Sequence, residues 1–327
     1  MPIKLLSIIY HPFSLWHAPE WLRPRLQRDF PQLEVTVRDD FKTIEDDIRE
    51  AEIFLGWSLR GEQLKAARQL RWIHSTAAAV HTLMSPELAA SDILVTNART
   101  VHGPVVAEHA IALILAMAKR LPSSIRYQQQ RQWAQDEIWA ERPEEVSGAT
   151  LLVIGLGSIG GGVAEKARKL GMHVLAVREH PERGPGAAHE VFGSAGLRTA
   201  LPRADFVVLA APVTPRTNRF FTAAELGWMK PRAFFINISR GSLVDEPALI
   251  AALRNRRIAG AALDVFDEEP LPEQSELWEL PNVLITPHTA GVTERMWDRQ
   301  YELLAENLQR YIARQPLLNP VDTKAGY

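Results

Sequence analysis

The chain has 327 residues, about twice the usual size of one domain, so we expect two compact units. Its 46% hydrophobic and 23% charged residues are ordinary for a globular protein, and a formal net charge of −2 argues against a surface for nucleic acid or anionic membrane. The chain has no cysteine, which excludes disulfides, a thiolate metal site and a cysteine nucleophile.

The N-terminal segment is predicted to be a strand and not a targeting signal. Its apolar run after Lys4 is too short for the core of a signal peptide, and no small-residue cleavage pattern follows. The most apolar stretch of the chain, 110–118, is far shorter than the ~20 residues that a membrane span needs. We therefore expect a cytoplasmic protein without a membrane partner and without a bound metal.

In the first hundred residues, short apolar runs alternate with helical patterns, which is typical of parallel α/β layers. This segment is predicted to be a small α/β unit of its own. Its expected strands are residues 5–9, 35–37, 53–57, 72–74 and 93–96.

A long apolar helix is predicted next, over 105–121, with Pro104 at its first turn and Pro122 just past its end. A second α/β series follows, and it has the pattern of a six-stranded doubly wound sheet. Its expected strands are residues 151–154, 173–177, 206–209, 233–237, 260–263 and 283–285.

The last segment, 293–314, again has helical spacing and is expected to return to the first unit. The first domain is then discontinuous, 1–99 with 290–327, and the second domain is 100–289. The apolar stripe predicted for the last helix is Met296, Trp297, Leu303, Leu304 and Leu308.

A glycine-rich turn carries the clearest binding signal. The apolar strand 151–154 leads directly into Gly155-Leu156-Gly157-Ser158-Ile159-Gly160, and a helical stretch follows. In this context the first glycine permits the tight turn, the second lets a pyrophosphate approach the helix N-terminus, and the third allows close packing of helix on sheet. The turn therefore predicts dinucleotide binding, although a purely structural turn has the same glycine pattern.

The residue expected to read the cofactor's 2′ position ends the next strand, about 20 residues further on. Here that residue is Arg178, where NAD enzymes usually have an acid. A cation attracts the 2′-phosphate of NADP, so we expect NADP. Arg183 in the following loop is either a further cation for the phosphate or a solvated charge. The adjoining Glu179 can still serve a ribose hydroxyl, which leaves NAD open.

Segments in a fixed order then define a resemblance. They are Asn97-Ala98-Arg99, Val101-His102-Gly103, Ala107-Glu108-His109, the glycine turn, Ala211-Pro212-Val213-Thr214-Pro215 with Thr217, and the stretches 237–246, 263–270 and 286–291. Over most of its length the chain resembles the D-isomer-specific 2-hydroxyacid dehydrogenases, which include glyoxylate and hydroxypyruvate reductases and D-lactate dehydrogenases.

The resemblance implies a fold and an activity. The expected fold is α/β, with a Rossmann-type doubly wound cofactor domain and a smaller, discontinuous flavodoxin-like substrate domain. The expected reaction is hydride transfer from NAD(P)H to a small 2-keto acid held between the lobes, giving the D-2-hydroxy acid. The expected assembly is a homodimer formed largely through the cofactor domains.

Three residues are expected to be catalytic. Arg240 follows a strand, at the edge where ligands bind in open α/β sheets, and its planar fork can hold a carboxylate and a carbonyl oxygen. In the resemblance, His288 gives a proton to the carbonyl oxygen, and Glu269, directly before Pro270, fixes the tautomer of its ring. The related formate dehydrogenases have a glutamine beside their histidine and need no proton donor.

Further contacts are carried over from the family. The segment Ser75-Thr76-Ala77-Ala78-Ala79-Val80 resembles the loop whose backbone amides hold the substrate carboxylate, except that Ala79 replaces the usual glycine. Ala78, Ala79 and Val80 are therefore expected to bind substrate. Trp57 is expected to line the same cleft, with a place in the core as the alternative. The expected cofactor contacts besides the glycines and Arg178 are Ser158, Ile159, Pro212, Thr217, Ile238, Ser239, Asp264 and Gly291, with plain packing as the alternative for Pro212 and Ile238.

Two other hypotheses about the function remain open. The first is a phosphite or phosphoglycerate dehydrogenase on the same fold, although phosphoglycerate enzymes often carry a further C-terminal domain and this chain ends about forty residues after His288. The second is a dinucleotide-sensing corepressor, which the lack of an extended disordered tail and of a basic face disfavours. The preferred 2-keto acid is not predicted by the sequence.

Overall fold

The computed structural model describes residues 2–11, 13–42, 44–59 and 61–326. It divides into two compact units, Met1–His102 with Thr293–Tyr327 (unit 1) and Gly103–Val292 (unit 2). The expected domain boundaries, at 99/100 and 289/290, lie a few residues before these crossings.

Unit 1 is built on a parallel five-stranded sheet of order β2-β1-β3-β4-β5, the strand order of flavodoxin-like folds. Its apolar strands are buried on both faces because helices cover the two sides. Every strand expected here is present. The strands are β1 (Ile3–Ile8), β2 (Leu33–Arg38), β3 (Ile53–Leu55), β4 (Trp72–Ser75) and β5 (Leu94–Asn97), and the helices are α1 (Leu22–Asp29), α2 (Glu45–Glu50), α3 (Gly61–Ala66), α4 (Pro86–Ala89) and α12 (Met296–Ile312).

The last helix, α12, belongs to the core of unit 1. Its Tyr301, Leu304 and Leu308 pack with Leu5 and Trp72 of the sheet. The expected apolar stripe is only partly right: Trp297 is half-buried, whereas the polar Gln300 and Asn307 are buried.

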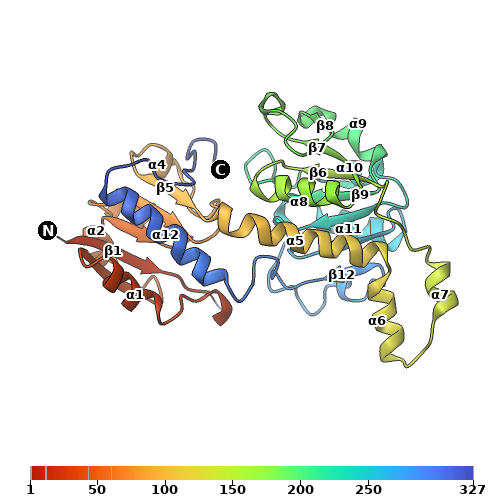
Figure 1. Ribbon diagram of the computed structural model, residues 1–327, viewed down its shortest axis with the longest axis horizontal. Coiled ribbons are helices and arrows are strands. Elements are labelled where there is room, and N and C mark those ends of the chain that lie inside the picture. Colours follow the sequence, from red (N-terminus) through yellow and green to blue (C-terminus); the bar gives the residue numbers. More distant parts are fainter. Residues whose placement is uncertain (1, 12, 43, 60, 327) are drawn as a thin grey trace. The chain divides into compact units, whose positions relative to one another are not determined.

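Unit 2 contains a parallel seven-stranded sheet of order β12-β11-β10-β9-β6-β7-β8. The strand order reverses between β6 and β9, as in doubly wound dinucleotide-binding folds (Figure 1). The strands are β6 (Thr150–Ile154), β7 (His173–Val177), β8 (Glu190–Phe192), β9 (Phe206–Leu209), β10 (Phe234–Asn237), β11 (Gly260–Leu263) and β12 (Val283–Ile285). The helices are α5 (Arg99–Ala118), of which residues 99–102 belong to unit 1, and α6 (Leu121–Gln129), α7 (Gln135–Ala140), α8 (Ser158–Lys169), α9 (Leu197–Ala200), α10 (Ala223–Trp228) and α11 (Glu246–Arg254).

The two faces of this sheet have separate cores. On one face α5 and α8 pack on the sheet, and on the other face α9, α10 and α11 do. The six expected strands are present, and the structure adds the edge strand β8, which pairs with β7. Its three residues are only half-buried, so they lack the apolar run that marks the other strands.

The ends of the long apolar helix differ from the prediction. It begins at Arg99, so Pro104 lies inside it, and it ends at Ala118, so Pro122 lies in the first turn of the next helix, α6. At 20 residues and a mean hydropathy of 1.6, α5 also has the length and composition of a membrane span, contrary to our expectation. However, 61% of its apolar stretch is buried in the protein, as in a core helix.

Two adjacent glycines in α8 give a matched test of the close packing in unit 2. A Cβ at Gly160 would lie 1.9 Å from the carbonyl oxygen of Gly155, whereas a Cβ at Gly161 would meet nothing within 4 Å. We expect Gly160→Ala to lower the stability by about 1–3 kcal/mol and Gly161→Ala to raise it by up to about 1 kcal/mol, measured by urea unfolding. Equal effects of the two substitutions would contradict this account of the turn.

Candidate functional site

Unit 2 brings the three expected catalytic residues to one edge of its sheet. Arg240 follows β10, Glu269 follows β11 and His288 follows β12, and these strands are parallel neighbours. Their carboxyl ends therefore meet at one edge, where open α/β sheets bind ligands.

Asp264, directly after β11, holds the loop that bears His288. Its carboxylate is 1% exposed, and it accepts hydrogen bonds from the Thr286 hydroxyl at 2.5 Å and from the amides of Thr289 and Ala290 at 2.9 and 3.0 Å. Its backbone carbonyl accepts from the amide of His288 at 2.9 Å. The structure shows that Asp264 holds this loop, and its expected contact with the cofactor stays a prediction.

His288 and Glu269 form a close pair. His288 Nδ1 lies 2.5 Å from Glu269 Oε2, and both side chains are about one-third exposed. Burial raises the pKa of the Glu269 carboxyl, but the hydrogen bond and charge of His288, joined by the Phe266 amide and a nearby guanidinium, hold that pKa below its ordinary value. Glu269 is therefore a carboxylate at neutral pH. The carboxylate therefore engages Nδ1 of the two ring nitrogens.

The backbone at His288 is in the left-handed region, with φ of 51°. Such a conformation is uncommon for a residue with a side chain and persists where surrounding contacts impose it, often at functional sites. Here those contacts are the bonds to Asp264 on both sides of the residue.

Arg240 is positioned by two neighbours. The Asn237 side chain closes the turn after β10 by accepting from the Ser239 amide and donating to the Arg240 carbonyl, both at 3.1 Å. Gly241 allows close approach of the acidic loop, because a Cβ there would lie 1.8 Å from the carbonyl carbon of Phe266. The half-buried guanidinium donates to the Ser239 carbonyl at 2.6 Å. Burial lowers its pKa, but the charges of the nearby carboxylates oppose this, and the group stays charged.

The glycine turn has the shape of a phosphate cradle. Gly155 has φ of 96°, and a Cβ there would lie 2.6 Å from the carbonyl oxygen of Ala210. At Gly157, which caps α8, a Cβ would meet nothing within 4 Å, so space is left beside the positive end of a twelve-residue helix. The first-turn amides of Ser158, Ile159 and Gly160 belong to this end. These residues fit the pyrophosphate of a dinucleotide.

At the end of β7, Arg178 is half-buried and donates to the Gly184 carbonyl at 3.1 Å. The alternative ribose acceptor, Glu179, is engaged elsewhere: it pairs with Arg216 at 2.9 Å and accepts from the Ser194 hydroxyl at 3.2 Å. Arg178 is thus the cation at the expected 2′ position, and the nearest acid, Glu179, is already paired.

The remaining expected cofactor residues have these places. Thr217 holds the loop after β9, since its hydroxyl donates to the Pro212 carbonyl at 2.7 Å and accepts from the Thr214 amide at 2.8 Å. Ile238 is buried in the core of unit 2, which is the packing alternative raised for it; Pro212 is exposed. The Ser239 hydroxyl donates to the Ala211 carbonyl at 2.5 Å, and Gly291 is half-buried in the loop after β12.

The expected substrate loop lies in unit 1, after β4. Two of its carbonyl oxygens accept hydrogen bonds. That of Ala77 accepts one from the Ala98 amide at 3.1 Å, and that of Ala78 accepts one from the Asn97 side chain at 2.7 Å. No described residue accepts a hydrogen bond from the amides of Ala78, Ala79 or Val80, and successive free amides suit an anion.

Ala79, at the usual glycine position, has no positive φ, so this alanine adds no backbone strain. Trp57, after β3 in the same unit, is half-buried and packs against the core and the ring of His11.

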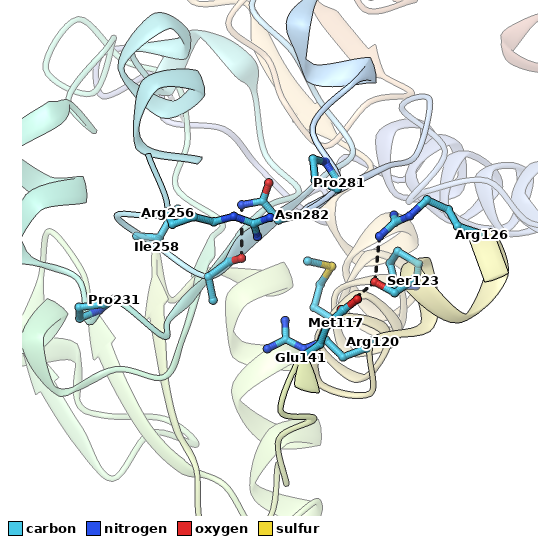
Figure 2. A pocket seen from close by; sticks show the side chains of 12 residues that line it. Met117, Arg120, Ser123, Arg126, Glu141, Pro231, Arg256, Ile258, Pro281 and Asn282 are labelled. Carbon is cyan, nitrogen blue, oxygen red and sulfur yellow. Dashed lines mark hydrogen bonds between the residues drawn. The ribbon is translucent and has the colours of Figure 1, made fainter. Parts of the chain in front are cut away.

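A separate pocket of about 290 Å³ in unit 2 lies at the opposite edge of the sheet (Figure 2). Pro231, Ala259 and Asn282, which precede β10, β11 and β12, line it together with Arg126, whose guanidinium donates to Ser123 at 2.8 Å. The pocket lies at the amino ends of these strands, whereas the three expected catalytic residues lie at the carboxyl ends. The pocket is therefore separate from the expected catalytic site.

Three residues near the site were not predicted from the sequence. Thr286 bonds to Asp264, and His109 of α5 lies 3.1 Å from the Thr286 hydroxyl. Arg216 reaches Glu179 from a loop far along the chain. Of the three, only Thr286 could have been found from the sequence, because it lies just after a strand. The contacts of His109 and Arg216 depend on the packing of segments that are distant in the sequence.

The fold and the glycine turn define a dinucleotide-binding α/β protein. Residues 111–290 match the sequence profile of the D-isomer specific 2-hydroxyacid dehydrogenase, NAD binding domain. The chain belongs to this family, and unit 2 carries its NAD-binding domain.

Its relatives include a glyoxylate reductase of Korarchaeum cryptofilum, 35% identical over 76% of this chain and 74% of that protein. A D-3-phosphoglycerate dehydrogenase of Synechocystis is 36% identical over 71% of this chain but 41% of that protein. Among solved structures, a D-isomer specific 2-hydroxyacid dehydrogenase of Xanthobacter autotrophicus, in complex with NADPH and MES, is 30% identical with a TM-score of 0.84 and matches all of both chains.

The Asp264 carboxylate can be tested by Asp264→Asn. One of its two oxygens then becomes an amide that faces an N–H or O–H donor, so we expect a loss of about 1–3 kcal/mol in stability, measured by thermal unfolding. As a control, Asp267→Asn removes only the exposed pair with Arg219 and should cost less than about 1 kcal/mol. Equal losses would mean that Asp264 does not hold the loop.

Proposed function

We propose that the protein reduces a small 2-keto acid, such as glyoxylate or hydroxypyruvate, to the D-2-hydroxy acid with NADPH. The observation that carries this proposal is the pair of His288 and Glu269, 2.5 Å apart, at the same sheet edge as Arg240. The family and relatives named glyoxylate reductase, at about 35% identity, support it.

In this proposal Arg240 binds and orients the substrate. Its planar fork takes the carboxylate and the keto oxygen together, which directs the keto carbon toward the cofactor side of the site. The amides of Ala78, Ala79 and Val80 supply further donors to the carboxylate, and Trp57 lines the space for the substrate side chain. A lysine at position 240 would keep the charge but lose the fork.

A bound nicotinamide would supply a hydride to the keto carbon. His288 supplies the proton: as the C=O bond becomes a single bond, Nε2 gives its hydrogen to the oxygen, and the ring becomes neutral. Glu269 holds the ring in place by accepting a hydrogen bond at Nδ1. The product is therefore the alcohol, with one hydride and one proton added across the carbonyl.

We also propose NADP as the preferred cofactor, with NAD as a weaker one. Arg178 at the end of β7, and the pairing of Glu179 with Arg216, support this choice. The related structure that contains NADPH is in accord with it.

The pH dependence tests the reaction and the proton donor together. We expect measurable initial rates of reduction with glyoxylate, hydroxypyruvate and a longer 2-keto acid, and we expect kcat/KM to fall as pH rises, because a general acid must carry a proton to act. Glu269→Gln removes the carboxylate that holds Nδ1, so kcat/KM should fall by about tenfold or more. Arg240→Lys should lower kcat/KM by about 100-fold or more at every pH.

A profile that stays flat from acid to alkaline pH, with chemistry rate-limiting, would refute the proton donor. If the protein binds dinucleotide but reduces no keto acid, oxidation of phosphite or a phosphoglycerate, or cofactor sensing, becomes the better account.

Cofactor choice is tested by Arg178→Asp. The introduced carboxylate repels the 2′-phosphate and can accept from a ribose hydroxyl, so KM for NADPH should rise by about tenfold or more while KM for NADH falls. Arg168→Asp on α8 is the control, because that arginine also bonds a single backbone carbonyl but lies at the helix end away from the turn. A wild-type preference for NADH would overturn the assignment of Arg178.

We propose a homodimer that forms through unit 2. Exposed apolar side chains gather on α6, α7 and the segment between them, where Trp133 and Trp139 are 91% and 79% exposed. We expect a second copy of the chain to bind over these exposed side chains. Light scattering should give twice the chain mass for the wild type and a shift toward the monomer for Trp139→Ser; a wild-type monomer would end this proposal.

A further inference from the structure

The pocket at the amino ends of β10, β11 and β12 carries charged groups that the proposed reaction does not use. Its lining comes from the end of α5, from α6, from the residue after α7 and from the segments before the three strands (Figure 2). All of these residues belong to unit 2. At about 290 Å³ the pocket is near the lower end of the volumes of small-molecule sites, so it fits only a compact ligand.

Three arginines line this pocket. Arg120 lies between α5 and α6, Arg126 lies on α6, and Arg256 lies before β11. Glu141 is the one acid among the described residues of the lining. Three arginines and one glutamate leave an excess of two positive charges, on a chain whose formal net charge is −2. The pocket is therefore a positive region of a slightly negative protein.

None of the three guanidinium groups forms an ion pair within the part of the chain that the structure describes. Arg120 donates to the Arg142 carbonyl at 3.4 Å, and Arg126 donates to the Ser123 hydroxyl at 2.8 Å. The guanidinium of Arg256 has neither a hydrogen bond nor an ion pair among the described residues. The donors of these arginines are thus largely left for another partner.

Other arginines of unit 2 differ in this respect. Arg203, Arg216 and Arg219 each pair with a carboxylate, at 2.5, 2.9 and 2.7 Å. In the pocket, the carboxylate of Glu141 accepts instead from the Ser123 hydroxyl at 2.7 Å. The lack of carboxylate partners is therefore a property of this pocket and not of arginines in this unit generally.

The charges around the pocket act on one another. Arg120 is half-buried, and burial lowers its pKa; the charges of Glu141 and Glu144 raise that pKa, and the charge of Arg256 lowers it. The group stays charged, so Arg120 and Arg256 are like charges near enough to repel each other. An anion in the pocket would offset this repulsion.

Two geometric features also favour an anion. In the view of Figure 2, Arg126 and Arg256 extend into the pocket from opposite sides. Pro122 and Ser123, in the first turn of α6, line it as well, so the positive end of this nine-residue helix borders the pocket. A guanidinium fork binds a carboxylate or a phosphate through paired N–H donors. Two forks on opposite sides suit a ligand with two anionic groups.

We propose that this pocket binds a compact molecule with at least two anionic groups, carboxylate or phosphate, and that Arg126 and Arg256 are its main contacts. The pocket lies at the edge of the sheet opposite to the proposed catalytic residues, so this is a second site of unit 2. The proposal does not depend on the reaction proposed above.

Binding is tested by titration calorimetry of the full chain with two probes, citrate and inorganic pyrophosphate, at about 150 mM NaCl to screen diffuse surface charge. We expect at least one probe to bind the wild type. Arg126→Gln and Arg256→Gln should each weaken that binding by about tenfold or more, because each removes a charge-assisted contact. Binding of citrate alone would identify carboxylates as the ligand chemistry, and binding of pyrophosphate alone would identify phosphates.

Two control variants separate the pocket from the rest of the surface. Arg254→Gln removes the same charge from an exposed arginine that pairs with Glu276 and does not line the pocket. Arg240→Lys alters the proposed substrate site at the other edge of the sheet. Each control should change the affinity for the probe by less than about twofold. A crystal structure of the wild type with the tighter probe needs no variant, and the probe should lie between Arg126 and Arg256.

Several results would overturn the proposal. They are a wild type that binds neither probe, binding that Arg126→Gln and Arg256→Gln leave unchanged, and a crystal structure with the probe outside the pocket. Equal weakening in Arg254→Gln would mean that the charge of the whole surface attracts the anion. Loss of binding in Arg240→Lys alone would place the probe at the proposed substrate site. Both of these results also contradict a site in this pocket.

Discussion

The site in unit 2 depends on one buried charge. A carboxylate removed from water is costly unless donors surround it, and Asp264 finds three of them in the loop after β12. That requirement ties the end of β11 to the loop of the next strand. The unusual backbone of His288 then follows, because the residue lies between bonds that both end on Asp264.

The other groups of the site lie close to the loops that Asp264 joins. His288 meets Glu269 on the same loop system as Asp264, and Gly241 lets the turn with Arg240 approach the peptide of Phe266. Each of these contacts joins the ends of neighbouring parallel strands. The sheet order therefore accounts for why residues spread over about fifty positions act at one place.

Much of this could be predicted because it follows local patterns. Continuous apolar runs marked the strands of both sheets, and a residue type just after a strand marked Arg240 and His288. The pattern was weak where few residues carry it, as in β8, and it misplaced the helix ends around Pro104 and Pro122. Buried polar residues such as Gln300 look like surface positions in a helical stripe, since only the packing of α12 on unit 1 shows what they bond. The pairing of Glu179 with Arg216 likewise depends on two loops that the sequence keeps far apart.

Unit 2 contains His288 and Glu269, which are proposed to transfer the proton, and Arg240, which is proposed to bind the substrate. The loop amides and Trp57 belong to unit 1. The family profile matches 111–290, almost wholly within unit 2. On the proposed function, the groups that transfer the proton and the side chain that lines the substrate space are therefore encoded on separate stretches of the chain. Substitutions at Trp57 would then change the fit of the substrate side chain while leaving the proton-transfer pair in place.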